Sequence, residues 1–255
     1  MKQKHYEPLN CRQCINTSPL GFDFSFAFQP IIRASTCEVV AYEALARGTE
    51  GQPFPEVWKH VNEENLYRFD QACRVKAIKL AAELELQTGL NINFTPNAVY
   101  RPELCIRTTL MAAREYGFPI DLIRFEVTEG EHVEDKAHLV GIINTYRELG
   151  FSTYIDDFGS GYSGLNLLAE FQPDCIKIDR GLITDIDEDE PRQAITRGII
   201  LTCQLLGITV LAEGVETAEE YRWLAEAGID LFQGYYFARP AFEQLVDVDR
   251  SLCVI

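Results

Sequence analysis

Phe151-Ser-Thr-Tyr-Ile-Asp-Asp157 is a short run of aromatic and β-branched residues that ends in two adjacent carboxylates. Such a run is typical of a buried strand. Residues Glu134–Leu149 precede it with the apolar spacing of an amphipathic helix, and Gly150 stands between the two segments, where a left-handed helix cap is expected. The sequence therefore predicts a helix that leads back into a buried strand with acidic residues at its end.

The same unit recurs on both sides of this run, from about Phe24 to the end of the chain. The expected strands are Phe24–Ile32, Val39–Ala46, Leu90–Phe94, Ile123–Val127, Phe151–Asp156, Cys175–Ile178, Thr209–Glu213 and Leu231–Gln233. The expected helices are Leu66–Gln87, Pro102–Tyr116, Glu134–Leu149, Pro191–Leu206 and Ala218–Ala227, and their expected caps are Gly89, Gly117, Gly150, Gly207 and Gly228. Alternation of strands and helices usually gives a parallel sheet.

The first two expected strands are separated by only about six residues, Arg33 to Glu38. A helical crossover does not fit there, so these strands should pair as an antiparallel hairpin. The chain has 255 residues, the size of one barrel domain. We therefore predict an α/β fold, a (β/α)8 TIM-like barrel with an antiparallel first strand, over residues 21–255. Residues 1–20 are expected to form an N-terminal tail or an irregular lead-in.

The formal net charge of −16 argues against nucleic-acid binding through a basic surface. No apolar run reaches the roughly 18 residues of a membrane helix, and the N-terminus lacks a signal-peptide core, so a cytoplasmic location is expected. Cysteines inside strand-like or helix-like patterns are expected to be small buried hydrophobic residues in a reducing compartment: Cys37, Cys73, Cys105, Cys175 and Cys203. Cys11 and Cys14 form a lone Cys-x-x-Cys, which we assign to a plain tail, with a metal or redox role as the alternative.

Seven consecutive expected strands carry an ionisable or amide side chain at or near the C-terminal end. These residues are Glu43, Asn93, Glu126, Asp156 with Asp157, Lys177, Glu213 and Gln233. Each has a structural explanation when taken alone: Glu43 could face solvent, and Glu126 could pair with Arg124 on one face of a strand. Independent surface charges would not gather at the same end of every strand. In a closed barrel those ends meet at one mouth, where active sites of this fold lie, so we predict a single polar site there.

The composition of this set indicates metal chemistry. Five carboxylates and a single lysine cannot be buried together unless cations neutralise them. Oxygen ligands select hard ions such as Mg2+ or Mn2+. The adjacent pair Asp156-Asp157 suits two ions held about 3.5–4 Å apart for an in-line phosphoryl displacement. Lys177 could orient the attacking water or stabilise developing negative charge.

Gly159-Ser-Gly-Tyr-Ser-Gly164 follows the fifth expected strand and, with Asp179 downstream, imitates the G-x-G-x-x-G signature of dinucleotide binding. Two carboxylates directly before the loop would repel a pyrophosphate, and the unit lies in the middle of the series instead of opening the fold. We expect a mobile glycine-rich loop over the active site instead.

Eight sequence blocks follow one another along the chain: Phe28-Gln-Pro-Ile31, Tyr42-Glu-Ala-Leu-Ala-Arg47, Asn91-Ile-Asn-Phe-Thr-Pro96, Glu126-Val-Thr-Glu129, Asp156-Asp-Phe-Gly-Ser-Gly-Tyr162, Ile176-Lys-Ile-Asp179, Ala212-Glu-Gly-Val-Glu216 and Gln233-Gly-Tyr-Tyr-Phe-Ala-Arg-Pro240. Together they cover about Phe26 to Pro240. In these blocks the chain resembles the EAL-domain cyclic di-GMP phosphodiesterases. The departures are small: the family favours Thr and Ser where this loop has Ser160 and Gly164, and Leu where the chain has Val127.

The resemblance implies hydrolysis of cyclic di-GMP, a bacterial second messenger, to linear 5′-pGpG with two Mg2+ or Mn2+ ions. Ca2+ is acceptable to the same oxygen donors, but its bonds are longer and its coordination is less regular than that of Mg2+, so we expect it to occupy the site and block hydrolysis. The implied ligands of one ion are Glu43, Asn93, Glu126 and Asp156, those of the other are Asp156, Asp157 and Glu213, and the implied catalytic residues are Glu43, Asp156, Lys177 and Glu213. The implied substrate-binding residues are Gln29, Leu45, Arg47, Asn93, Lys177, Asp179, Glu216 and Gln233. Glu129 is implied as an anchor of the glycine loop, and the region around Ser160–Glu170 as a homodimer contact.

Two other functions remain open. A degenerate member of the same family could bind cyclic di-GMP or a protein partner without cutting, but loss of Glu43 or Asp156 would be expected there and neither is lost. An enolase-like barrel with Mg2+ and a lysine base would share the carboxylate cluster but not the ordered motifs. Turnover of cyclic di-GMP, compared with that of sugar acids, separates a cyclic di-GMP phosphodiesterase from an enolase-like enzyme. No DNA partner and no membrane partner is expected.

Overall fold

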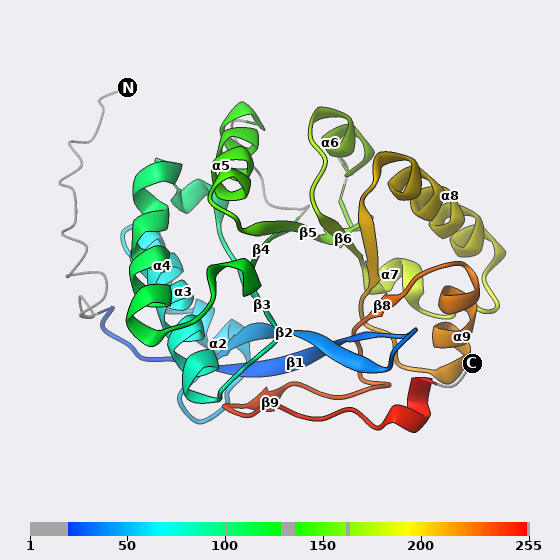
Figure 1. The fold of residues 1–255 in the computed structure, drawn as a ribbon, viewed down its shortest axis with the longest axis horizontal. Coiled ribbons are helices and arrows are strands. Elements are labelled where there is room, and N and C mark those ends of the chain that lie inside the picture. The colour runs from blue at the N-terminus through cyan, green and yellow to red at the C-terminus, as the bar shows by residue number, and fades with distance from the viewer. Residues whose placement is uncertain (1–19, 100, 129–135, 162–163, 254–255) are drawn as a thin grey trace.

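The computed structural model describes residues 20–99, 101–128, 136–161 and 164–253. Within these ranges eight strands close into a barrel (Figure 1). They are β1 (Ser25–Arg33), β2 (Glu38–Arg47), β3 (Gly89–Asn93), β4 (Ile123–Thr128), β5 (Ser152–Phe158), β6 (Cys175–Ile178), β7 (Thr209–Ala212) and β8 (Leu231–Phe232). The order β2-β3-β4-β5-β6-β7-β8-β1 closes on itself because β1 also pairs with β2. The predicted (β/α)8 TIM-like barrel is confirmed. Residues 1–19 lie outside the described ranges, so the expected tail and its Cys11 and Cys14 stay predictions.

β1 runs antiparallel to both of its barrel neighbours, whereas the remaining barrel pairs are parallel. The reason is the short turn at residues 34–37, which leaves no room for a helical crossover to β2. The predicted antiparallel first strand is therefore confirmed. The register of this hairpin places Gln29 opposite Glu43, so the reversed strand still brings a polar side chain to the level of the predicted site.

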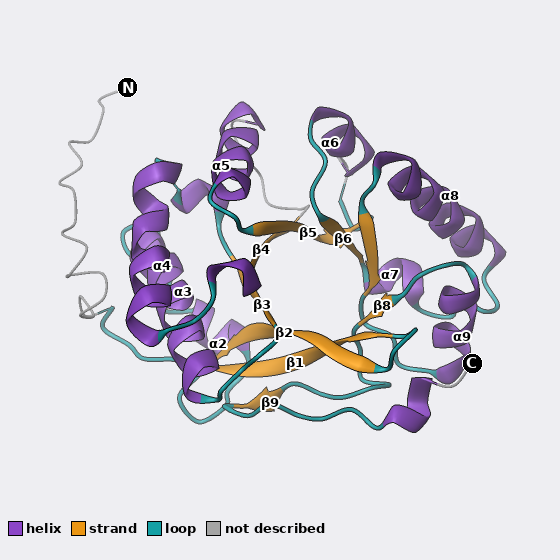
Figure 2. Cartoon of the chain, in the orientation of Figure 1, coloured by secondary structure: helices purple, strands orange, loops and turns teal. Residues whose placement is uncertain are grey.

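The longer helices surround the barrel (Figure 2): α3 (Leu66–Glu83), α4 (Pro102–Tyr116), α5 (Lys136–Glu148), α6 (Gly164–Glu170), α8 (Glu190–Leu206) and α9 (Ala218–Glu226). The shorter elements are α2 (Phe54–Trp58), α7 (Arg180–Ile183) and the 3-10 turns Pro96–Ala98, Ile120–Leu122 and Arg250–Cys253. None of the helices in the described ranges is both long and apolar enough to cross a bilayer.

Two of the predicted glycine caps have the left-handed backbone that a helix cap requires, and the prediction of a third, Gly89, is wrong. Gly117 and Gly207 end their helices in the left-handed region, with φ of 69° and 71°. Gly89 instead begins β3, and Glu85, with φ of 56°, takes the left-handed position after α3. A side chain at position 89 would meet the guanidinium of Arg124, so this glycine serves packing instead of capping.

Strand periodicity divides the barrel lumen into an apolar floor and a polar mouth. The floor is a separate cluster formed by Ile31, Ala41, Tyr154, Cys175, Leu211 and Leu231. Each of these lies two residues from a polar residue of the predicted site, and side chains two apart on a strand point to the same face. The larger core lies between the strands and the helices and includes the fully buried Phe28, Ile78, Phe125, Tyr146, Ile176 and Phe232.

The C-terminal segment crosses the outside of the hairpin and is covalently tied to it. β9 (Ala241–Phe242) pairs with β1 at Ala27 and Phe28, and Cys253 forms a disulfide with Cys37. The expectation that Cys37 is a buried free thiol is therefore wrong, because this residue lies in the turn between β1 and β2 and its partner is 216 positions away. The other four cysteines are confirmed as buried free thiols: Cys73, Cys105, Cys175 and Cys203.

Candidate active site

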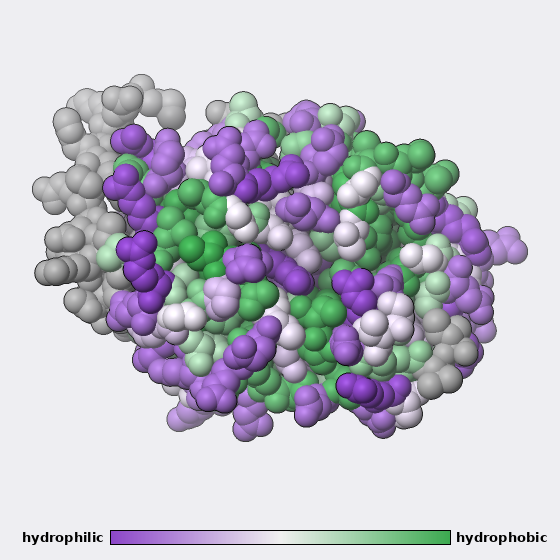
Figure 3. Space-filling model, viewed as in Figure 1, coloured by the Kyte–Doolittle hydropathy of each residue, from purple (hydrophilic) through white to green (hydrophobic). Residues whose placement is uncertain are grey.

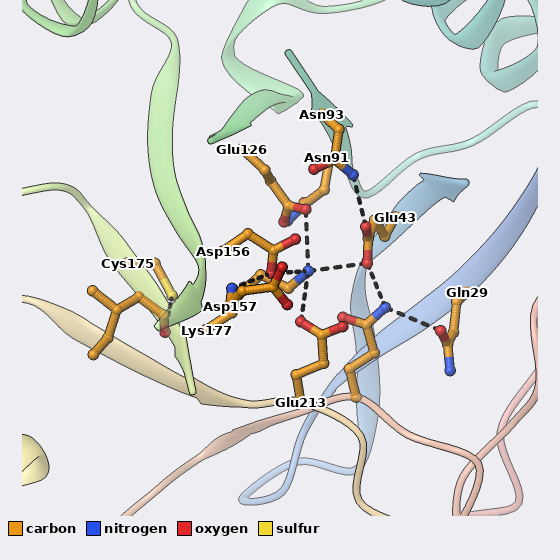
Figure 4. A network of polar contacts seen from close by, with 12 residues as sticks. Gln29, Glu43, Asn91, Asn93, Glu126, Asp156, Asp157, Cys175, Lys177 and Glu213 are labelled. Atoms are coloured by element: carbon orange, nitrogen blue, oxygen red, sulfur yellow. Dashed lines mark hydrogen bonds and ion pairs between the residues drawn. The ribbon is translucent and has the colours of Figure 1, made fainter. Parts of the chain in front are cut away.

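The predicted strand-end residues converge at the mouth of the barrel (Figure 4). Glu43 on β2, Glu126 on β4 and Lys177 on β6 are almost completely buried, with exposed fractions of 2%, 0% and 0%. Asp156 on β5 is buried beside them, and Glu213 follows the end of β7. The structural explanations for Glu43 and Glu126 are excluded, since neither side chain faces solvent. Five strands thus contribute to this cluster, and Asn93 on β3 and Gln233 after β8 border it through hydrogen bonds to Glu43.

The Lys177 ammonium lies at the centre of four carboxylates. Its Nζ is 3.0 Å from Glu43 Oε2, 3.1 Å from Glu126 Oε2, 3.0 Å from Asp156 Oδ1 and 3.0 Å from Glu213 Oε2. Burial by itself would lower the pKa of Lys177, but the surrounding carboxylates, Asp156 foremost, raise that pKa well above its ordinary value. The ammonium is therefore held protonated and acts as the cationic centre of the cluster.

Amide side chains orient the Glu43 carboxylate through hydrogen bonds. Asn93 Nδ2 donates to Glu43 Oε1 at 2.9 Å, and Gln233 Nε2 donates to Glu43 Oε2 at 2.7 Å and to Gln29 Oε1 at 3.3 Å. Gln29 Nε2 donates in turn to the backbone carbonyl of Ala238 at 3.2 Å. Glu43 consequently keeps a defined orientation, because each of its oxygens accepts at least one hydrogen bond.

A local irregularity in β5 lets two consecutive carboxylates serve one site. In a regular strand Asp156 and Asp157 would point to opposite faces of the sheet. The pairing of β5 with β6 shifts register between Ile155 and Phe158, and Asp157 has a left-handed φ of 54°. Burial, and then the nearby Asp156, raise the pKa of Asp157 to about 6. Figure 4 shows both aspartates beside Lys177.

The residues present fit divalent metal ions. Carboxylate oxygens of Glu43, Glu126 and Asp156 all lie within 4.8 Å of one another. Burial raises the pKa values of Glu126 and Glu213 well above normal, against the attraction of Lys177, so a single ammonium does not neutralise the cluster. Additional cationic charge is what such a buried group of acids requires. Because the donors are oxygens, hard ions such as Mg2+ or Mn2+ suit the site.

Two cavities border the cluster through different residues. The larger, of about 670 Å3, is lined by the predicted Leu45, Arg47, Asn93 and Asp157 and has the aromatic side chains of Phe54 and Trp58 in its wall. The smaller, of about 190 Å3, is lined by the predicted Gln29, Asp179, Glu213 and Glu216, together with Arg180 and Tyr235. The predicted substrate-binding residues are thus divided between two adjoining hollows.

Asp179 and Glu216 also make contacts with neighbouring residues, whereas Glu129 and part of the glycine loop lie outside the described ranges. Asp179 caps α7 by accepting a hydrogen bond from Gly181 N at 2.8 Å, and Glu216 is exposed and paired with Arg180 at 2.6 Å. Glu129, the expected loop anchor, lies outside the described residues, and its role stays a prediction. Gly159 and Ser160 begin the glycine loop, of which residues 162 and 163 also lie outside the described ranges.

Sequence reasoning missed several residues that the structure brings to the site. Asn91 donates to Glu126 Oε1 at 2.5 Å, and its signal was the two-residue spacing from Asn93. The fully buried pair Asp70–Arg74, at 2.6 Å, ties α3 to the loop after β3, because Asp70 Oδ1 also accepts from Thr95 N. The rings of Phe54 and Trp58 are tilted against each other with centroids 5.5 Å apart, in a short helix with too few residues for a periodic signal.

Comparison with known proteins links this site to one family. The family described as EAL domain matches residues 17–240. The Escherichia coli (strain K12) protein named blue light- and temperature-regulated antirepressor BluF is 35% identical over 215 residues, which is 84% of this chain and 53% of that protein. Cyclic di-GMP phosphodiesterase NbdA of Pseudomonas aeruginosa is 33% identical over 224 residues, 84% of this chain and 28% of its own length. The chain therefore spans about half or less of these relatives.

Solved structures resemble the chain over more of its length. A standalone versatile EAL protein from Vibrio cholerae O395, in its c-di-GMP bound form, is 54% identical with a TM-score of 0.90, covering 93% of this chain and all of that one. The calcium/cy-diGMP complex of Klebsiella pneumoniae BlrP1 is 37% identical with a TM-score of 0.84, covering 91% of this chain and 59% of that one. A manganese/cy-diGMP complex of the same protein is 38% identical with a TM-score of 0.82, over 89% and 58%.

Proposed function

The chain belongs to the EAL domain family, and on that premise we propose that it hydrolyses cyclic di-GMP to linear 5′-pGpG with two Mg2+ or Mn2+ ions. The observation that carries the proposal is the buried cluster in which Glu43, Glu126, Asp156 and Glu213 surround one ammonium. No structural role in a barrel calls for four acids at this depth, since each costs free energy to bury. The proposed activity would lower the level of a bacterial second messenger.

The residue roles follow from the donors and their positions. Glu43, Asn93, Glu126 and Asp156 would hold one ion, and Asp156, Asp157 and Glu213 the other. When bound, two such ions neutralise a phosphate and stabilise the attacking and leaving oxygens of an in-line displacement. Lys177 has three donors and no acceptor, so it would hold a phosphate oxygen or the attacking water.

The two cavities supply the surface for an extended dinucleotide. The larger one offers an aromatic wall for a planar base, and Arg47 in its lining would bind a phosphate. Gln29, Asp179 and Glu216 in the smaller one would contact the other half of the substrate. Relatives solved as cyclic di-GMP complexes support this substrate, and the presence of calcium or manganese in complexes of one of them supports the use of divalent ions.

A second candidate function is a receptor or antirepressor that binds cyclic di-GMP or a protein without cutting. It is favoured by the similarity to BluF, which is named an antirepressor. The catalytic proposal is preferred because the side chains proposed as ligands lie close together around the mouth: Glu43, Asn93, Glu126, Asp156, Asp157 and Glu213.

We further propose that the protein forms a homodimer through the region around residues 160–170. We also propose that it is located in the cytoplasm. Leu165 on α6 is 61% exposed, and on α8 Leu201 and Leu205 are 57% and 79% exposed. Figure 3 shows hydrophobic surface over α8, which a second copy could cover. Leu165→Glu should then convert a dimer to a monomer in light-scattering measurements, and cell fractionation would test the location.

The function is tested by incubating the purified protein with cyclic di-GMP and Mg2+ or Mn2+ and identifying the product. Linear 5′-pGpG is expected, and Glu43→Gln or Asp156→Asn should lower kcat at least roughly a hundredfold. Binding of cyclic di-GMP without cleavage in either metal would favour the receptor. Turnover of sugar acids in place of the dinucleotide would favour an enolase-like enzyme.

A further inference from the structure

We propose that Asn91 is a positioning residue that fixes the Glu126 carboxylate so that one chosen oxygen faces the metal site. The inference rests on the proposed function, because it concerns how a ligand of that same site is oriented. Asn91 lies on β3 two residues before Asn93, opposite Glu43 on one side and Arg124 on the other.

The position of Asn91 in the lumen is unusual for an amide. On β2, β5 and β6 the residue two positions before the site residue belongs to the apolar floor: Ala41, Tyr154 and Cys175. On β3 that position holds an amide with no exposed surface. An amide buried without compensation costs about 1–3 kcal/mol, so an apolar residue would be favoured here if only packing mattered.

The two oxygens of Glu126 have partners of different mobility. Oε1 accepts from Asn91 Nδ2 at 2.5 Å, and Oε2 accepts from Lys177 Nζ at 3.1 Å. Lys177 has a long side chain that already divides its contacts among four carboxylates, so it can yield Oε2 to another cation. Asn91 has a short side chain on a central barrel strand and cannot withdraw. Oε1 therefore stays bound to the amide while Oε2 is left for the metal.

The unpaired atom of Asn91 points to the same role. Its Oδ1 is buried and has no hydrogen-bond partner among the described residues. A half-turn of the amide would expose Nδ2 to a new partner but would bring two acceptor oxygens together at Glu126. The amide is thus kept for its donor, at the cost of an unsatisfied acceptor. Partners of metal ligands commonly act in this way, and their loss typically weakens metal binding by about 10- to 100-fold.

The test compares Asn91→Leu with Asn91→Ala by titrating Mn2+ alone into metal-free protein, together with thermal unfolding. Leu has nearly the shape of Asn but no donor, and we expect Mn2+ affinity to fall roughly 10- to 100-fold. Ala leaves space for a water that can donate to Glu126, so its loss should be smaller. Thr196→Val, which alters a buried polar residue on α8 away from the site, should leave Mn2+ affinity unchanged.

A purely structural role makes the opposite prediction. Ala would then destabilise the protein more than Leu, because it leaves the larger cavity, and neither variant would change Mn2+ affinity in the folded state. Mn2+ affinity within about twofold of wild type in the Leu variant overturns the proposal, as does a larger loss in Ala. If the Leu variant does not fold, the test rests on Ala: weaker Mn2+ binding than in Thr196→Val supports the proposal, and Mn2+ affinity equal to that control overturns it. Wild-type protein that binds Mn2+ but does not cleave cyclic di-GMP refutes the function and leaves this comparison valid.

Discussion

Replacing Lys177 with Met tests the electrostatic design of the site. The variant keeps the shape of the side chain but removes the cation that contacts four carboxylates at 3.0–3.1 Å, of which Glu43, Glu126 and Asp156 are buried. Removing one partner of a buried ion pair costs about 3–5 kcal/mol, because the remaining charges are left uncompensated. For a chain of this size, that corresponds to a fall in Tm of roughly 6–20 °C in metal-free protein.

Metal ions should reverse much of this loss. In the Met variant they supply the missing positive charge, whereas in wild type they compete with the Lys177 ammonium for the same oxygens. Saturating Mn2+ should therefore raise the Tm of the variant more than that of wild type. Turnover should not recover and should remain at least roughly a hundredfold below wild type, because no ammonium is left to hold the phosphate or the water.

The assay is differential scanning calorimetry in chelator and in Mn2+, followed by cleavage of cyclic di-GMP. Lys79→Met is the matched control, since Lys79 pairs with Glu83 at 3.6 Å on the surface and is 48% exposed. Such a pair contributes at most about 0.5 kcal/mol. A metal-free Tm of Lys177→Met within about 2 °C of the control would refute the electrostatic reasoning. Wild-type kcat in the variant would show that Lys177 has no catalytic role.

Three further predictions concern the metal ion, the binding of a nucleobase and the disulfide. Ca2+ is expected to bind and to permit binding of cyclic di-GMP, since it neutralises the same charges, yet to block cleavage, because its bonds of about 2.3–2.6 Å and variable coordination do not reproduce those of Mg2+. Calorimetry and a cleavage assay in the same buffer check this, and turnover in Ca2+ equal to that in Mg2+ contradicts it. Trp58→Ala should raise KM roughly 5- to 100-fold with little change in kcat, because an exposed surface on which a nucleobase could stack in the larger cavity is lost. Trp223→Phe on α9 is the control. An unchanged KM in Trp58→Ala would show that no nucleobase of the substrate binds against this side chain. Reduction of Cys37–Cys253 should destabilise the fold by up to about 5 kcal/mol through the entropy of a loop closed over 216 positions, with a lower Tm as the readout. An unchanged Tm, with both thiols shown to be free by labelling, would exclude this contribution.

The barrel could be read from the sequence because its signals are local. Each strand is short and rich in β-branched and aromatic residues, and each helix has its own periodicity, so repetition along the chain was sufficient. The reversed first strand was also predictable, since the length of the turn before Glu38 excludes a crossover. β9 and α2 were not predicted, because segments of two and five residues carry too little periodicity.

The site was predictable as a set of residue types but not as an arrangement. Polar residues at successive strand ends must meet at one mouth once the barrel closes, and that rule placed Glu43, Glu126, Asp156 and Lys177 together. The sequence did not reveal that the ammonium contacts all four acids, because a side-chain rotamer depends on neighbours from other strands.

The amino-acid pattern by itself determined the barrel, the end of it at which the polar side chains gather and the oxygen-rich character of that cluster. Only the tertiary structure decided which atoms meet: the amide of Asn91 with Glu126, the left-handed turn at Asp157 that aims two consecutive aspartates at one site, and the bond between Cys37 and Cys253. The physical reason is separation along the chain. Periodicity and turn chemistry act over a few residues, whereas the Asn91–Glu126 and Cys37–Cys253 contacts join residues 35 and 216 positions apart. The turn at Asp157 lies where the pairing of β5 with β6 shifts register, so it too depends on the closed barrel.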